Sequence, residues 1–274
     1  MEMSEKALKR KKIDFNSVSS VLYPVLFGIL IFVLWECGVL NTVLKTDTNI
    51  LPAPTRIAGI MSENSSKISE NLSATMTVII WGLIAGSFLG YMAAVFATRF
   101  PNFGKGALTV LSVFNAIPIV ALAPVFNNWT KDVSSEASVR STVAKILVVT
   151  VVCAASMSIN AYRGLTELKP FSLDLMKSYA ADNMTVFKKL RFHNSIPYIF
   201  TALKVSVPSS VITALVSEYF AEYRMGIGRQ IRDNISIAQY SAGWAYIAVA
   251  CLIGILMYII LIIFEGIFTK RHRK

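Results

Sequence analysis

Six long apolar runs constrain the fold of this chain more than any other feature of its sequence. A helix needs about 20 mostly apolar residues to cross the hydrocarbon core of a bilayer. Runs of this length occupy residues 21–40, 74–97, 107–127, 143–162, 196–217 and 243–268. Prolines and hydroxyl side chains interrupt the third and fifth runs. We therefore expect an all-α integral membrane protein with six transmembrane helices.

The overall composition agrees with lipid as the main solvent of the folded chain. Of its 274 residues, 54% are hydrophobic and only 16% are charged, whereas an average soluble domain carries about 25% charged residues. The three cysteines, Cys37, Cys153 and Cys251, lie inside apolar runs without metal-ligand spacing. They are therefore expected to behave as small buried hydrophobes, and no metal site is predicted.

Lysine and arginine are concentrated in alternate segments between the runs. If the N-terminus is inside, the inner segments include "KALKRKK", residues 163–191 and the terminal "KRHRK". Cytoplasmic segments of membrane proteins carry such an excess of positive charge, so both termini are predicted to be cytoplasmic. Trp35, Trp129 and Trp244 then lie near outer span ends, where indole rings favour the interface. Topology thus explains the net charge of +11, and we expect no nucleic-acid partner.

The predicted organisation is a single membrane domain with short basic ends. Residues 1–20 would form a cytoplasmic N-terminus, residues 21–269 the six-helix domain, and residues 270–274 a cytoplasmic tail. No small-residue cleavage site follows the first run, so we expect it to be a retained span and not a signal peptide.

The longest inner segment, residues 163–195, is polar but keeps a helical pattern. Apolar residues recur there at steps of three or four, which places them on one face of a helix: Leu173, Met176, Ala180, Met184, Phe187 and Leu190. A turn at Asp182-Asn183 would instead give two short helices. Such a segment packs on its own spans, lies in the lipid headgroups, or docks a cytoplasmic protein.

This segment resembles the cytoplasmic loop of the permease subunits of binding-protein-dependent ABC importers. The family loop reads Glu-Ala-Ala, three residues, Gly, nine residues, Ile, any residue, Leu-Pro. In this chain Asp174 stands at the Glu position, Ala180 at Gly, Leu190 at Ile and His193 at Pro. The spacing matches throughout, although most identities differ.

The resemblance extends over nearly the whole chain. The stretches that carry it are "LWECG", "ILPAPTRI", "NAIPIVALAP", "INAYRGL", "PYIFTALKV" and "SEYFAEYRMGIG". They are most similar to the branch of the family that handles sulfonates, taurine, nitrate, thiamine-precursor pyrimidines or riboflavin. The resemblance implies a type I importer permease in the bacterial plasma (inner) membrane.

The resemblance also implies partners. The chain has no GxxxxGK[ST] loop to cradle phosphates, so it is not expected to be an enzyme or to bind a cofactor. ATP and Mg²⁺ would be bound by a cytoplasmic ATP-binding subunit, present in two copies. A second permease copy, the same or a different chain, and an extracytoplasmic solute-binding protein would complete an importer for a small solute, with a pyrimidine or vitamin precursor, or a sulfonate-like anion, as the favoured substrate.

Site residues follow from the matched positions. The predicted contacts with the ATPase lie in the inner loop: Asp174, Met176, Lys177, Ala180, Met184, Phe187, Leu190 and His193. The predicted outer contact with the binding protein comprises Glu218, Gly226 and Gly228.

Hydroxyl and amide side chains mark a candidate transport pathway. On the fifth span Ser206, Ser210, Thr213 and Ser217 share one helical face. This stripe, with Ser156, Asn160 and Asn115, either holds the helices together, because polar groups are costly when they face lipid, or lines the pathway, and both roles can hold at once.

Two other classes of membrane protein are alternatives to an importer permease: a secondary transporter or facilitator, and an enzyme. A secondary transporter usually needs an ionisable residue near mid-membrane, and the middles of the six runs carry none. A facilitator or channel without an ATPase stays open as the alternative function. A membrane enzyme is disfavoured because His193 and His272, the two histidines, lie apart in basic inner segments.

Overall fold

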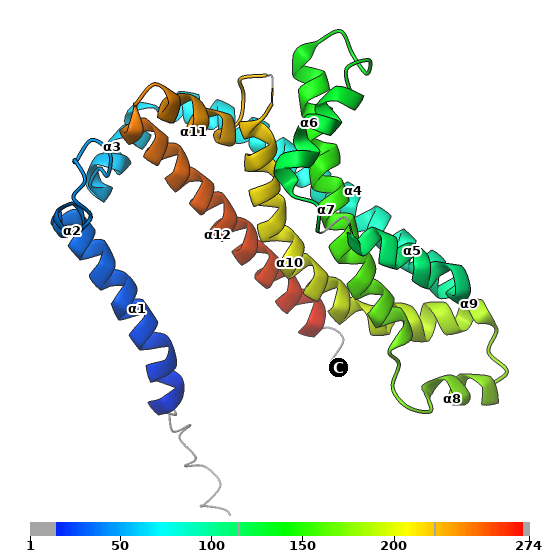
Figure 1. The fold of residues 1–274 in the computed structure, drawn as a ribbon. Coiled ribbons are helices and arrows are strands. Elements are labelled where there is room, and N and C mark those ends of the chain that lie inside the picture. The colour runs from blue at the N-terminus through cyan, green and yellow to red at the C-terminus, as the bar shows by residue number, and fades with distance from the viewer. Residues whose placement is uncertain (1–14, 114–115, 222, 271–274) are drawn as a thin grey trace, which may run out of the picture.

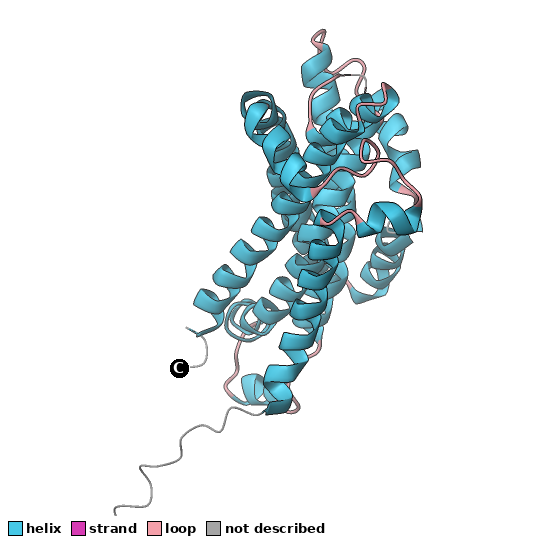
Figure 2. Cartoon of the chain, turned by 90° about the vertical axis from the view of Figure 1, so that its left-hand side faces the viewer, coloured by secondary structure: helices cyan, strands magenta, loops and turns pink. Residues whose placement is uncertain are grey.

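The computed structural model describes residues 15–113, 116–221 and 223–270, and its regular elements there are all helices. Figure 2 shows helices along most of this chain, joined by short loops. The helices are α1 Phe15–Glu36, α2 Val39–Leu44, α3 Pro54–Glu63, α4 Ser65–Arg99, α5 Pro101–Val113, α6 Ile119–Trp129, α7 Ala137–Thr166, α8 Ser172–Ser178, α9 Asn183–Val186, a π-helical segment Phe187–Arg191, α10 Phe192–Tyr219, α11 Ile227–Ser236 and α12 Tyr240–Lys270.

Four helices in the described residues are long and apolar enough to cross a membrane: α4, α7, the continuous stretch Asn183–Tyr219, and α12. Shorter apolar helices, Leu22–Glu36 and Ile119–Trp129, lie at the first and third predicted spans. In the third run, which prolines were expected to interrupt, α5 ends at Val113 and α6 begins after Pro118. Pro118 lacks an N–H and disfavours helical geometry in the residue before it, so a helix ends easily there.

The centre of the molecule is formed by α4, α7 and α10, with α12 beside α10 (Figure 1). Glycines at every fourth position of α4 let its backbone touch α7. A β-carbon on Gly86 would lie 2.6 Å from the Thr150 carbonyl oxygen, and one on Gly90 would lie 2.5 Å from that of Ala154. Small residues at such spacing allow close helix packing in membranes. The backbones of α4 and α7 are thus in direct contact.

Helix α1 lies apart from this centre in Figure 1, and its C-terminal end contacts α3 and α12. There Glu36 accepts hydrogen bonds from the N–H and hydroxyl of Thr55, at 3.1 and 2.6 Å, in the first turn of α3. The Trp35 ring lies 5.5 Å from that of Trp244 in α12, and the Trp244 indole N–H donates to the carbonyl of Ile50 at 2.8 Å. These contacts bring together the stretches "LWECG" and "ILPAPTRI".

The two ends of the molecule differ in what they carry. In Figure 1, α2, α3 and α11 lie at one end, while α8, α9, the start of α1 and the end of α12 lie toward the other. The loop around α8 and the connection into α11 are therefore on opposite ends of the bundle. These two regions contain the predicted site residues outside the candidate pathway.

Candidate functional site

The inner loop consists of two helical pieces separated by a sharp turn, which confirms the predicted break and cap at Asp182-Asn183. Only the first piece is a short helix, because the second continues without a break into α10. After α8 the N–H of Ala180 donates to the Lys177 carbonyl at 2.8 Å, and that of Ala181 to the Met176 carbonyl at 3.0 Å. This pair of bonds is the Schellman arrangement, which places one residue in the left-handed region. That residue is Ala180, with φ +50°. Its backbone explains why the resembling family uses Gly at this position.

The second piece begins with a side-chain cap. The carboxylate of Asp182 accepts a hydrogen bond from the N–H of Thr185 at 3.3 Å and so starts α9. This bond stabilises the charged form and lowers the pKa of the Asp182 carboxyl. The side chain is exposed, so the cap is accessible to water.

Because the chain turns at Ala180, the predicted apolar face does not run through the whole loop. Phe187 is half-buried and packs against the inner core cluster around Met157 and Leu165. Met184 is 58% exposed, and Leu190 and Met176 are half-buried. The prediction of a single stripe from Leu173 to Leu190 is therefore wrong.

The polar residues predicted in this loop lie on its surface. Asp174 and Lys177 form an exposed ion pair at 3.6 Å along α8. A ring nitrogen of His193, Nδ1, lies 2.9 Å from the carbonyl of Lys188.

Three strongly exposed apolar side chains of the loop form a different row, which the sequence analysis did not single out. Phe171, Leu175 and Tyr179 follow one another at steps of four and are 82%, 57% and 78% exposed. Leu175 lies within α8, and Phe171, with φ +63°, and Tyr179 are the residues directly before and after this helix. We call these three residues the α8 edge. The repeated step of four was visible in the sequence, but the longer pattern through Met176 and Ala180 concealed it.

At the opposite end of the bundle, Glu218 lies in the interior with no exposed surface. Its Oε2 accepts hydrogen bonds from the N–H of Gly228 at 2.9 Å and from the Thr75 hydroxyl at 3.1 Å. Gly228 is in the first turn of α11, where backbone N–H groups lack helical partners and a negative charge is favoured. Glu218 therefore caps α11 from the end of α10.

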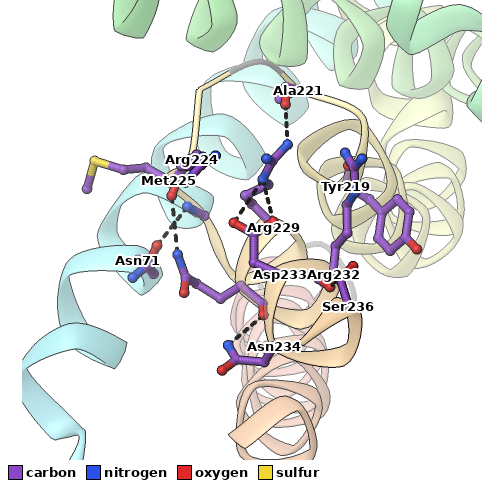
Figure 3. A network of polar contacts seen from close by, with 12 residues as sticks. Asn71, Tyr219, Ala221, Arg224, Met225, Arg229, Arg232, Asp233, Asn234 and Ser236 are labelled. Carbon is purple, nitrogen blue, oxygen red and sulfur yellow. Dashed lines mark hydrogen bonds and ion pairs between the residues drawn. The ribbon is translucent and has the colours of Figure 1, made fainter. Parts of the chain in front are cut away.

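Further side chains fix the connection that leads into α11. Asn71 of α4 accepts a hydrogen bond from the N–H of Gly226 at 2.9 Å, as Figure 3 shows. Thr75 accepts one from the N–H of Ile227 at 2.9 Å. The ammonium of Lys145, a residue of α7 only 3% exposed, donates to the carbonyl of Met225 at 3.3 Å. Side chains from α4, α7 and α10 thus converge on one short turn.

The arginines of α11 complete this network on the other side of the turn (Figure 3). Arg229 pairs with Asp233 at 3.0 Å and donates to the carbonyl of Ala221 at 2.7 Å. Arg232 donates to the carbonyl of Tyr219 at 2.9 Å, and its guanidinium lies 5.5 Å from the centre of that ring. These bonds hold α11 against the end of α10.

The residues predicted to contact a binding protein are all in this interior. Glu218, Gly226 and Gly228 are buried, so in this conformation they shape the turn and do not form outer surface. Gly226 has φ +117°, and a β-carbon there would lie 2.3 Å from Cδ of Glu218. Glycine is needed at this position both for its backbone angle and for its lack of a side chain.

The hydroxyl stripe of α10 also faces the interior of this chain. Ser206, Ser210, Thr213 and Ser217 are all buried, and the Cys153 thiol of α7 lies 3.9 Å from the carbonyl of Ser206. Ser210 and Ser217 bond to carbonyls of their own helix. Within the described part of the chain, the hydroxyls of Ser206 and Thr213 have no hydrogen-bond partner. The stripe thus packs α10 against α7 in this conformation.

The remaining candidates for the pathway belong to α7 and to the third apolar run. Ser156 and Asn160 are half-buried, and the Asn160 amide donates to the carbonyl of Ser156 at 2.9 Å. Asn115 lies outside the described residues.

Comparison with protein families finds one that matches most of the chain. The model of the family described as "Binding-protein-dependent transport system inner membrane component" matches residues 86–274. This stretch includes the loop around α8 and the turn into α11.

Curated relatives are similar at low identity over most of their length. The formylaminopyrimidine transport permease protein ThiX of Halalkalibacterium halodurans is 24% identical over 254 residues, which cover 92% of this chain and 97% of the relative. The riboflavin transport system permease protein RibX of Chloroflexus aurantiacus is 22% identical over 245 residues, covering 88% and 87%. A probable ABC transporter permease protein of Haemophilus influenzae is 23% identical over 199 residues, covering 73% and 77%.

Two solved structures share the fold. One is the MetNI methionine ABC transporter in an inward-facing conformation, with a TM-score of 0.54 and 15% identity over 74% of this chain and 96% of that chain. The other is an amino acid ABC transporter, with a TM-score of 0.56 and 14% identity over 77% and 97%. At these identities the likeness concerns the fold alone.

Proposed function

This chain belongs to the family of binding-protein-dependent transport system inner membrane components, and we propose that its importer draws energy from ATP hydrolysed by a separate cytoplasmic subunit. Family membership makes it a permease subunit of an ABC importer and a multi-pass protein of the plasma (inner) membrane. Two copies of the ATP-binding subunit would bind ATP and Mg²⁺. The α8 edge would be the surface on which each of them acts.

The exposed α8 edge is the observation that carries this proposal. None of the seven residues of α8, all of which the structure describes, is buried. Two aromatic rings and a leucine at steps of four would be costly on a surface facing only water. An amphipathic helix of this kind suits a hydrophobic groove on a partner. Asp174 and Lys177 beside the edge would orient the helix in that groove.

A second permease copy, forming a homodimer, is also proposed, with both termini in the cytoplasm. Its support is apolar surface that this chain does not cover by itself. On α10 the exposed residues follow the outward face at steps of three and four: Thr201, Val205, Pro208 and Ile212. Two copies would create a pathway between them, which ATP-driven movement of two α8 helices would open to alternate sides.

For the substrate we propose a small uncharged vitamin precursor, delivered by an extracytoplasmic solute-binding protein. Two relatives are named for formylaminopyrimidine and riboflavin. A sulfonate-like anion would favour an available cation in the pathway, but the ammonium groups of Lys145 in α7 and Lys204 in α10 both have partners in this chain. Lys145 donates to the carbonyl of Met225, and Lys204 pairs with Glu265 at 2.7 Å. A neutral ring would need no such cation.

Uptake in the native host tests this function. Deleting the chain should abolish accumulation of labelled formylaminopyrimidine or riboflavin, and restoring it should return the activity. Depleting ATP while keeping the membrane potential should stop uptake within minutes. Uptake that continued down a gradient without ATP would identify a facilitator and reject the proposed function.

A further inference from the structure

The C-terminal end of α7 is capped by side chains that follow the inner loop in the sequence. The last carbonyls of an α-helix have no partner in the helix itself. Here Arg191 donates through Nη1 to the carbonyl of Leu165 at 2.7 Å. Asn194 donates through Nδ2 to the carbonyls of Gly164 and Glu167, at 2.8 and 3.0 Å. Two side chains thus cap three carbonyls across the base of the loop.

The backbones of the two helices meet at the same place. A β-carbon on Gly164 would lie 2.8 Å from Cα of Ser195, which is fully buried at the start of α10. Next to this contact the Tyr198 hydroxyl donates to Glu167 at 3.3 Å, and the hydroxyls of Tyr91 and Ser195 are 3.3 Å apart. The ends of α7 and α10 therefore form one closely packed unit.

Helix α8 is connected to the rest of the bundle mainly through the closely packed ends of α7 and α10. Helix α8 has no residue buried among those the structure describes in it, and the chain turns sharply at Ala180 on one side of it. On the other side, residues 167–171 are not helical. Both chain segments lead back to the same closed base, because Arg191 ends the π-helical segment that continues into α10. A displacement of α8 reaches the bundle through that base.

We propose that Arg191 and Asn194 are positioning residues of the transport cycle, which clamp the ends of α7 and α10 so that a displacement of α8 moves both helices together. This inference rests on the proposed function, since it needs an ATP-driven subunit that displaces α8. Without the clamp the loop base opens and absorbs the displacement. ATP would then be hydrolysed while α7 and α10 no longer move as one unit.

The distance between the end of α7 and the start of α10, measured with and without ATP, tests the clamp. This measurement does not require the substrate. Spin labels on Thr166→Cys and Pro197→Cys, both exposed positions, report this distance in the complex with the ATP-binding subunit. Cys37 and Cys251 are first replaced by Ser so that they are not labelled. A third label at Lys169→Cys, paired with Pro197→Cys in a separate sample, reports the movement of the loop. Pulsed electron resonance is recorded without nucleotide and with ATP plus vanadate.

In the wild-type chain the helix ends should keep one narrow distance in both states while the loop label moves. Arg191→Ala should broaden that distance in the ATP state, because it removes a charge-assisted hydrogen bond, which is worth about tenfold in the equilibrium between the closed and open base. Asn194→Ala should also broaden the distance, through the loss of its two neutral hydrogen bonds. Arg191→Lys, which keeps a charged donor, should largely restore the narrow distance. Lys189→Ala removes a charge from an exposed side chain of the same π-helical segment and should behave as wild type.

Two outcomes separate failure of the clamp from failure of the proposed function. A loop label that does not move with ATP in the wild-type complex, or a wild-type chain that binds no ATPase, would reject the proposed function. A loop label that moves while both alanine variants keep the narrow distance would reject the clamp. If Arg191→Ala does not assemble, Asn194→Ala alone decides, because it removes only neutral hydrogen bonds.

Discussion

The carboxylate of Glu218 accepts a hydrogen bond from the backbone N–H of Gly228 at 2.9 Å, inside the protein and away from any surface. This bond joins the end of α10 to the start of α11. It explains how a glutamate at the end of an apolar helix is tolerated without access to water, because a buried acid needs hydrogen-bond donors around it.

Replacing Glu218 by alanine should destabilise the protein by about 2–4 kcal/mol. The N–H of Gly228 and the hydroxyl of Thr75 would lose their acceptor in a buried place, and Lys145 would lose a nearby negative charge. Thermal unfolding in detergent measures the loss. Glu63→Ala, at an exposed position of α3, is the control and should change little. Equal midpoints for the two variants would contradict the structural role of Glu218.

Gly226→Ala should be at least as damaging as loss of the glutamate, since the added β-carbon would overlap Cδ of Glu218 and the backbone angle is unfavourable. Gly254→Ala is the matched control, because a β-carbon at Gly254 meets no atom within 4 Å. In the same unfolding assay the control should be neutral or slightly stabilising. A stable Gly226→Ala protein would show that the turn is built differently.

Ala180→Gly should stabilise the inner loop by about 1 kcal/mol, because alanine is strained in the left-handed region that glycine adopts readily. Hydrogen exchange over residues 172–185 should become slower. Ala181→Gly is the control, since Ala181 does not have a positive φ and added backbone freedom there should speed exchange. Faster exchange in Ala180→Gly would mean that the turn at the end of α8 is not formed.

The cap of α9 should depend on pH. Since the folded pKa of Asp182 is lowered, its contribution to stability is present above the unfolded pKa, about 4, and is lost as the pH falls through the folded value. Exchange of the α9 amides, corrected for intrinsic rates, should therefore accelerate below about pH 4. Asp182→Asn keeps an acceptor without the titration and should remove this pH dependence. Identical pH profiles for both proteins would disprove the cap.

Those features of the fold that depend on neighbouring residues could be predicted from the sequence. Hydropathy located the long helices, and the spacing around Asp174 and Leu190 located the inner loop. The row Phe171, Leu175 and Tyr179 was missed because the helical period was continued through Ala180, and alanine gives no sign of a left-handed turn.

The outer network was not predictable for a different reason. Thr75 and Ile227 are 152 positions apart and meet only because the start of α11 packs against α4. Glu218 was expected to reach the surface, since it stands at the end of an apolar run. Nothing local in the sequence indicates that the chain after Phe220 folds back and covers it.

A charge on the α8 edge should prevent docking of the ATPase. Leu175→Asp should weaken its binding about tenfold or more, because the carboxylate would have to enter an apolar groove. Asn183→Asp, an exposed change at the start of α9, introduces the same charge outside the edge and should bind normally. Titration of the purified permease with the ATP-binding subunit measures both affinities. Equal affinities for the two variants would remove the α8 edge from the interface.

Mild-detergent purification of the tagged chain from its own host, read by mass spectrometry, tests the central claim most directly. An ATP-binding subunit should copurify with the wild-type chain, and it should be lost from Leu175→Asp while Asn183→Asp retains it. If the wild-type chain comes down alone, under conditions that preserve a known complex of this type, the account of an ATP-driven permease is contradicted.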